Sequence, residues 1–150
     1  MSMRVIRILG DGRCMYRALV RGLHLAQNKP LQPSEETNQA DALRRRVCDE
    51  LGKRREDFEP FIDCDFDAYV CDQRRPSAWG GEPELACAAT VLECVIHVYQ
   101  QSTQGGLGMI SQYGELAKGG SRPPAINLLF HRLGHYDLLI LMPGQIQSKL

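Results

Sequence analysis

Residues 10–19 read GDGRCMYRAL, a glycine-containing turn that runs directly into a segment with helical spacing. After Tyr16, apolar side chains recur at Leu19, Val20 and Leu23, which is the spacing of one face of a helix. The pattern predicts a helix over residues 14–27. One cysteine, Cys14, stands at the start of this helix, and its function depends on which side chains the other segments place near it.

The start of a helix is a favourable place for a nucleophilic cysteine. Unpaired backbone N–H groups and the positive end of the helix dipole favour the thiolate of Cys14 over its thiol, and the thiolate is the reactive form. Gly10 and Gly12 allow the backbone to pass close to a substrate carbonyl and to turn amides toward it. A lone cysteine is more often an inert buried residue, so this interpretation depends on partners elsewhere in the chain.

The length and composition predict one globular domain without a secretory or membrane segment. The chain has 150 residues, of which 43% are hydrophobic and 24% charged. The charges of its 18 basic and 18 acidic residues cancel. The arginines of residues 44–46 stand among acidic residues, so we expect them to form a solvent-facing helix surface rather than a nucleic-acid site. No apolar run is long enough for a membrane span. We expect a cytoplasmic or nuclear protein that binds neither nucleic acid nor membrane.

The six cysteines form neither a disulfide framework nor a zinc motif. They stand at positions 14, 48, 64, 71, 87 and 94, without a C-x-x-C spacing. Without a secretory signal we expect reduced thiols. We interpret Cys64, Cys71, Cys87 and Cys94 as small core residues, and we expect no metal ion.

The remaining segments alternate between helical and strand patterns. Apolar spacing predicts helices over residues 34–52, with Ser34 as the N-cap, near 58–62, near 66–70 and over 82–92. Alternating or β-branched segments predict strands over residues 4–9, 95–99, 125–130 and 136–142, the last two as an antiparallel hairpin. The glycine-rich residues 100–124 are expected to form a loop with a short strand at 109–113.

The final predicted strand supplies partners for Cys14. Side chains alternate along a strand, so His135 and Asp137 project to one side and Tyr136 to the other. A carboxylate beside an imidazole can accept its Nδ1 proton, which would leave Nε2 facing the nucleophile. The spacing of a His-x-Asp pair is weak evidence by itself.

Three blocks of sequence together resemble the ovarian tumour (OTU) family of cysteine deubiquitinases. They are residues 11–18 (DGRCMYRA), 79–85 (WGGEPEL) and 134–137 (GHYD), which occur in family order and span nearly the whole chain. The resemblance implies an α/β (α+β) papain-like cysteine protease fold of the OTU type, with a small, mostly antiparallel central sheet flanked by helices. It also implies that residues 1–150 form a single OTU catalytic domain.

The resemblance implies a catalytic triad and a reaction. Cys14 corresponds to the nucleophile, His135 to the general base and then acid, and Asp137 to the residue that orients His135. The implied reaction is hydrolysis of the isopeptide bond at the C-terminus of ubiquitin through a thioester on Cys14, without a metal or other cofactor.

The cysteine loop has further roles in the family. Asp11 matches an acidic position that supports the loop, and the backbone amides of Gly12, Arg13 and Cys14 correspond to the oxyanion hole. Arg13 replaces the asparagine often found before the nucleophile. Because the amide would serve the oxyanion, we expect activity to survive; the side chain either faces solvent or contacts substrate.

The implied substrate-binding residues are Trp79, Gly80, Gly134 and Tyr136. Two interpretations of Trp79 stay open: it flanks a narrow channel for the ubiquitin tail, or it is a core anchor for the following helix. The implied partners are ubiquitin and polyubiquitin chains, and we expect a monomer. The alternative function is a catalytically impaired ubiquitin-binding module of the same fold.

Overall fold

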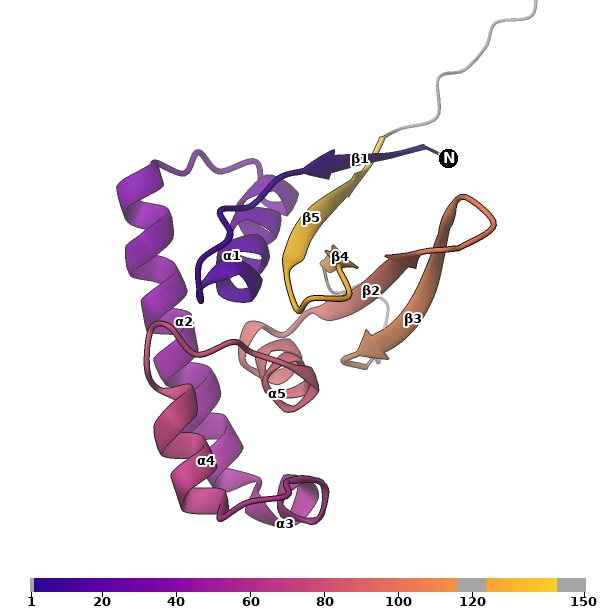
Figure 1. The fold of residues 1–150 in the computed structure, drawn as a ribbon. Helices are drawn as coiled ribbons and strands as arrows, with labels where there is room; N and C mark the ends of the chain where they lie inside the picture. The colour runs from indigo at the N-terminus through magenta and orange to yellow at the C-terminus, as the bar shows by residue number, and fades with distance from the viewer. Residues whose placement is uncertain (1, 116–123, 143–150) are drawn as a thin grey trace, which may run out of the picture.

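The computed structural model describes residues 2–115 and 124–142, and all of its strands belong to one open sheet (Figure 1). The order across the sheet is β1-β5-β4-β2-β3. Only the β2–β4 pair is parallel, so the mostly antiparallel sheet predicted from the sequence is confirmed. The strands are β1 (Met3–Ile6), β2 (Val95–Gln101), β3 (Leu107–Tyr113), β4 (Ala125–Phe130) and β5 (Tyr136–Leu141).

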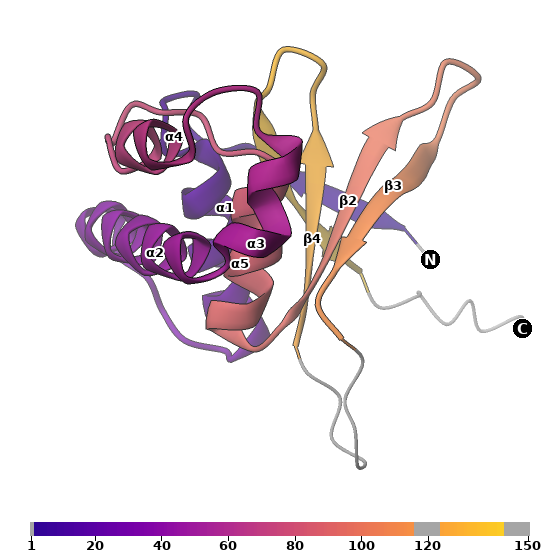
Figure 2. The ribbon, with the colours of Figure 1, turned by 90° about the horizontal axis from the view of Figure 1, so that it is seen from below.

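The helices gather on one side of this sheet, as two views at right angles show (Figures 1 and 2). Helix α1 lies nearest to β4 and β5, and α2 packs on its other side. Among the described residues, no helix combines the length and apolar character needed to cross a membrane. The helices are α1 (Cys14–Ala26), α2 (Pro33–Lys53), α3 (Arg55–Phe58), α4 (Phe66–Gln73) and α5 (Glu82–Leu92), with a 3₁₀ turn at Glu59–Phe61.

Helix α1 forms the centre of the core. Its buried residues include Met15, Tyr16 and Leu19, none of which is more than 1% exposed. Gly22 lets the helix approach the sheet closely, because a Cβ there would lie 2.8 Å from a methyl group of Ile126 and 3.0 Å from one of Leu138. This contact fixes α1, and therefore Cys14 at its first turn, against β4 and β5.

Two local predictions about secondary structure were wrong. Helix α2 begins at Pro33 with Gln32 as the capping residue, so Ser34 is not the N-cap; proline suits the first helical position because its missing N–H has no partner there. The predicted strand at 109–113 is confirmed as part of β3, but it pairs with β2, so residues 100–113 are mainly a hairpin rather than a loop. Gly105 and Gly106 adopt φ values of +86° and +81° in its turn, which allows β2 and β3 to pair almost to the tip. Residues 116–123 of the predicted loop lie outside the described residues.

The prediction that four cysteines are core residues holds for two of them. Cys87 and Cys94 are buried, whereas Cys64 and Cys71 are exposed, and all six cysteines are free thiols. Cys64 precedes α4, and the core-facing residues of α4 are Phe66 and Val70. Cys64 and Cys71 are seven residues apart, but this spacing does not place them together on a buried helix face.

Candidate active site

The turn before α1 is closed by Asp11. The backbone amide of Cys14 donates to the Asp11 carbonyl oxygen at 3.1 Å, and the amide of Arg13 donates to Asp11 Oδ1 at 3.1 Å. The Gly12 amide makes no hydrogen bond with another described residue. Of the three amides predicted to form an oxyanion hole, two are thus engaged within the loop, and that of Gly12 is available.

A buried arginine network holds Asp11 in this position. Arg17, which is 7% exposed, donates from Nη2 to Asp11 Oδ2 at 3.0 Å and from Nε to both carboxylate oxygens at 3.2 Å. Burial alone would raise the pKa of Asp11, but the hydrogen bonds and charges of Arg17 and Arg13 bring it below its ordinary value. Asp11 therefore carries a negative charge that orders the cysteine loop.

A second arginine, Arg44, fixes the other side of the loop. Its guanidinium donates to the carbonyl oxygens of Gly12 at 2.8 Å, Pro76 at 3.0 Å and Gln73 at 2.9 Å, and it lies over the Tyr16 ring at 4.5 Å. Arg44 is only 2% exposed. The prediction that it belongs to a solvent-facing surface was wrong, because these three carbonyls accept from Nη1 and Nη2 inside the protein, while the buried Nε has no hydrogen-bond partner among the described residues.

The partner residues come from the β4–β5 hairpin. His135 immediately precedes β5, and its Nε2 lies 2.8 Å from Asp137 Oδ1. The expected His–Asp pair is therefore formed, but the expectation that Nδ1 would bind the carboxylate was wrong. The edge of the ring that carries Nδ1 faces Gly10 instead, 3.9 Å from the position of a Cβ there. In this orientation Nδ1, rather than Nε2, is left for a reacting group.

Asp137 is buried and fully engaged. Its Oδ1 accepts from the backbone amide of Ile8 at 2.7 Å and from His135, and its Oδ2 pairs with His131 Nε2 at 2.8 Å. Burial tends to raise the pKa of Asp137, but the bonds from Ile8, His135 and His131 hold it below its ordinary value. The side chain thus provides a stable anion beside the imidazole. His131 was not among the predicted site residues.

Cys14 lies at the start of α1, the helix that packs beside β5. The cysteine is only 4% exposed. Burial raises the pKa of its thiol, and the nearby backbone amides of Tyr136 and Met15, which favour the thiolate, offset this only in part. The position at the helix start predicts a stabilised thiolate. The cost of desolvating the charge outweighs this effect of the helix, so a base must remove the thiol proton during a reaction.

Of the four predicted substrate-binding residues, Trp79 and Gly134 pack on each other at the β4–β5 hairpin, whereas Tyr136 is buried. Trp79 is 53% exposed, which rules out a role as a core anchor, and its ring packs directly on Gly134. Gly134 has a φ of +96°, and a Cβ there would lie 2.5 Å from the Trp79 ring. Gly80 packs on the side chain of Met15. Tyr136 is 5% exposed, so its ring points into the core.

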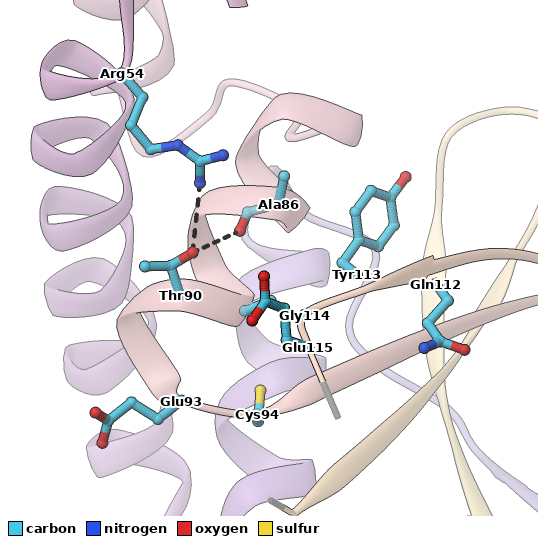
Figure 3. Close-up of a pocket in the computed structure, with 10 residues that line it drawn as sticks. Arg54, Ala86, Thr90, Glu93, Cys94, Gln112, Tyr113, Gly114 and Glu115 are labelled. Carbon is cyan, nitrogen blue, oxygen red and sulfur yellow. Dashed lines mark hydrogen bonds between the residues drawn. The ribbon is translucent and has the colours of Figure 1, made fainter. Parts of the chain in front are cut away.

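A cavity of about 670 Å³ lies away from these residues, between α5 and the end of β3 (Figure 3). Arg54, Thr90, Glu93 and Cys94 are among its lining residues, and none of the predicted site residues lines it. Within residues 2–115 and 124–142, no group of three or more His, Cys, Asp or Glu side chains is arranged to hold a metal ion.

Sequence comparison connects this arrangement with known proteins. Residues 9–137 match the family model described as "OTU-like cysteine protease". The chain is 45% identical over 140 residues to OVARIAN TUMOR DOMAIN-containing deubiquitinating enzyme 4 of Arabidopsis thaliana, covering 91% of this chain and 43% of that protein. It is 32% identical to the corresponding enzyme 3 of the same plant, covering 90% of this chain and 67% of that protein. The chain thus spans less than half the length of the first relative.

Solved structures show the same fold. The OTU domain of OTUD1 superposes with a TM-score of 0.73 at 21% identity, covering 93% of this chain and 86% of that one. The Hazara virus OTU bound to ubiquitin gives a TM-score of 0.66 at 21% identity, covering 94% and 82%. The papain-like, OTU-type fold class predicted from the sequence is confirmed.

Proposed function

Because this chain belongs to the OTU family of cysteine proteases, we propose that it is a deubiquitinase. Its reaction is the hydrolysis of the isopeptide bond that joins the C-terminus of ubiquitin to a lysine amine. One observation carries the proposal: Cys14 opens helix α1, which packs against β5, and the hydrogen-bonded pair of His135 and Asp137 lies at the start of that strand. We assign Cys14, His135 and Asp137 to one site as nucleophile, base and orienting acid.

In the first half of the reaction, His135 Nδ1 accepts the Cys14 proton while Sγ attacks the carbonyl carbon of the last ubiquitin residue. The tetrahedral intermediate collapses with cleavage of the C–N bond, and the imidazolium donates its proton to the departing lysine amine. Ubiquitin is left as a thioester on Cys14. The raised pKa of the buried thiol supports this order, because the thiol keeps its proton until a base accepts it.

In the second half, His135 accepts a proton from water as the water attacks the thioester carbonyl. Collapse of the second tetrahedral intermediate breaks the C–S bond, and the proton returns to sulfur, which releases ubiquitin with a free carboxylate. The charge of Asp137 stabilises the imidazolium in both halves. Its bond to Nε2 holds the ring with Nδ1 available for each transfer.

The oxyanion of both intermediates would be stabilised by the amides of Gly12, Arg13 and Cys14. The free Gly12 amide supports this role, while those of Arg13 and Cys14 would have to exchange their bonds to Asp11 for bonds to the oxyanion. A single such donor is worth about 3–4 kcal/mol in related chemistry. The Arg13 side chain binds Asp41 at 2.7 Å and takes no part in this role.

The substrate is ubiquitin, attached to a protein or within a polyubiquitin chain. Related folds have been solved with ubiquitin bound, and the exposed Trp79 ring over Gly134 supplies one apolar wall for a glycine-ending tail. We propose that residues 1–150 act as a single catalytic domain and as a monomer. We place it in the cytoplasm or nucleus, with no nucleic-acid or membrane partner.

The decisive experiment is cleavage of a panel of differently linked diubiquitins. The full chain should release monoubiquitin, and Cys14→Ser and Cys14→Ala should abolish the release. Cys71→Ser is the matched control because Cys71 is an exposed thiol on α4 and lies outside the site. Cleavage by Cys14→Ala would refute the proposal.

A ubiquitin with a C-terminal electrophile distinguishes the hydrolase from the alternative function, a catalytically impaired ubiquitin-binding module. An adduct located on Cys14 by peptide mass spectrometry supports the hydrolase. Tight binding of ubiquitin without an adduct would favour the module instead.

A further inference from the structure

The loop between β4 and β5 places two histidines opposite each other. The backbone amide of His131 donates to the His135 carbonyl oxygen at 2.8 Å, and the Gly134 amide donates to the His131 carbonyl at 2.8 Å. With Gly134 at a φ of +96°, this is a three-residue hairpin loop that ends in a glycine bulge. Since Phe130 and Tyr136 are the neighbouring cross-strand pair, His131, His135 and Asp137 project from the same face.

On that face, the carboxylate of Asp137 bridges the two imidazoles. Oδ1 is 2.8 Å from His135 Nε2, and Oδ2 is 2.8 Å from His131 Nε2. The ring centroids lie 5.5 Å apart. The Asp137 side chain is 9% exposed, whereas that of His131 is 46% exposed, so His131 covers the carboxylate from the solvent side.

We propose that His131 is a positioning residue of the active site, which acts on His135 through Asp137. Among the described residues, His131 is the sole hydrogen-bond partner of Oδ2. Without it, this oxygen of a nearly buried carboxylate would lack a donor, and the group would be free to rotate toward water. Oδ1 also serves the Ile8 amide, so rotation would weaken the bond that orients His135.

The inference rests on the proposed function, because it assigns His131 to the same reaction. It predicts a specific kinetic effect. His131 is expected to act on the orientation of the base, so its loss should lower kcat and leave KM for ubiquitin unchanged. In metal sites, loss of a residue that hydrogen-bonds to a ligating side chain typically lowers affinity or activity about 10–100-fold. We expect an effect of this size on kcat.

The first test uses the full chain and ubiquitin with a C-terminal fluorogenic amide. His131→Ala should lower kcat about 10-fold at constant KM, and His131→Gln, which keeps an N–H donor, should recover most of the loss. Arg132→Ala, a change of the adjacent exposed loop residue, should match the wild type. Equal kcat values for His131→Ala and the wild type would overturn the inference, as would a rise in KM alone.

A double-mutant cycle shows whether the effect passes through Asp137. In an Asp137→Ala background the additional His131→Ala change should have no effect, because the group it positions is gone. A full 10-fold further loss would show that His131 acts by another route and would overturn the assignment.

The second test does not require ubiquitin, so it separates this inference from the proposed function. Alkylation of Cys14 by iodoacetamide, followed by peptide mass spectrometry, should be slower in His131→Ala than in the wild type and partly restored in His131→Gln. Equal rates would refute the positioning role. An inactive wild type that still shows this difference would refute only the hydrolase function.

Discussion

Arg44 Nη2 lies 2.8 Å from the carbonyl oxygen of Gly12, which joins the middle of helix α2 to the loop that ends at Cys14. The same guanidinium also binds the carbonyls of Pro76 and Gln73. A Cβ on Gly12 would lie 2.4 Å from the backbone of Ser77, so the cysteine loop is in direct contact with the segment that follows α4. Arg44 therefore couples the geometry of the cysteine loop to the packing of the helices.

Replacement of Arg44 should damage both stability and activity. Arg44→Met would keep most of the apolar volume but leave three carbonyls without their donor, and we expect a loss of about 2–3 kcal/mol in unfolding free energy. Urea unfolding of the full chain measures it, with the exposed neighbour Arg45→Met as the control. An Arg44→Met protein as stable as the control would show that the hydrogen bonds of Arg44 to the three carbonyls do not stabilise the fold.

Gly134 should tolerate no side chain. Gly134→Ala would place a Cβ 2.5 Å from the Trp79 ring at a φ of +96°, which predicts a loss of about 1–3 kcal/mol and lower activity. Gly108→Ala is the matched control, because Gly108 has open space around it. Thermal unfolding of both variants is the measurement, and similar midpoints would show that the Trp79–Gly134 contact is loose.

Trp79→Ala should separate binding from chemistry. The ring is more than half exposed, so we expect its removal to change stability little and to raise KM for a ubiquitin substrate about 10-fold at constant kcat. Phe61→Ala removes another exposed aromatic ring, in the 3₁₀ turn that follows α3, and should have no effect on KM. A lower kcat with unchanged KM would place Trp79 in the chemical step instead.

Alkylation of Cys14 should respond to alkaline pH. Burial raises the pKa of this thiol, so the thiolate fraction is small at neutral pH and increases as the pH rises through the folded-state pKa. We expect the midpoint of the rate profile to lie above about 8.5, the value of an ordinary cysteine. Peptide-resolved alkylation from pH 6 to 10 gives this midpoint, and a value below 7 would indicate a resting thiolate–imidazolium pair.

Acid should weaken the contribution of Asp11 to stability. Its folded-state pKa is lowered, so its stabilising charge is fully present above the unfolded value of about 3.9 and is lost as the pH falls through the folded value. The difference in unfolding free energy between the wild type and Asp11→Asn should therefore shrink between pH 6 and pH 2. Asp63→Asn, at an exposed carboxylate, should show no such trend.

The parts of the site that could be predicted are those set by local patterns. Cys14 at a helix start follows from helical spacing, and the pairing of His135 with Asp137 follows from strand alternation together with the resemblance to the OTU family; both features are present in the structure. The ring orientation of His135 could not be predicted in this way. The ring bonds Asp137 through Nε2 and lies beside Gly10, which is 125 positions away in the chain and close in space only after folding.

Two missed residues did leave a signal in the sequence. Arg44 stands one position after Leu43 and three before Val47, within the apolar stripe of its helix, so its burial follows from the same spacing that identified the helix. His131 lies opposite His135 across the predicted hairpin. The carbonyl oxygens that accept from Arg44 in the core belong to Gly12, Gln73 and Pro76, and they could not be located without the tertiary structure.

The pairing of β1 with β5 has a consequence for biosynthesis. Strand β1 has no other neighbour in the sheet, and the Ile8 amide that follows it binds Asp137. On the ribosome, the N-terminal strand and Cys14 must therefore wait until residues 135–141 have emerged before the sheet closes and the nucleophile obtains its base. A nascent or prematurely terminated chain would carry the cysteine without its catalytic partners, so the proposed protease would become active only once β5 has joined the sheet.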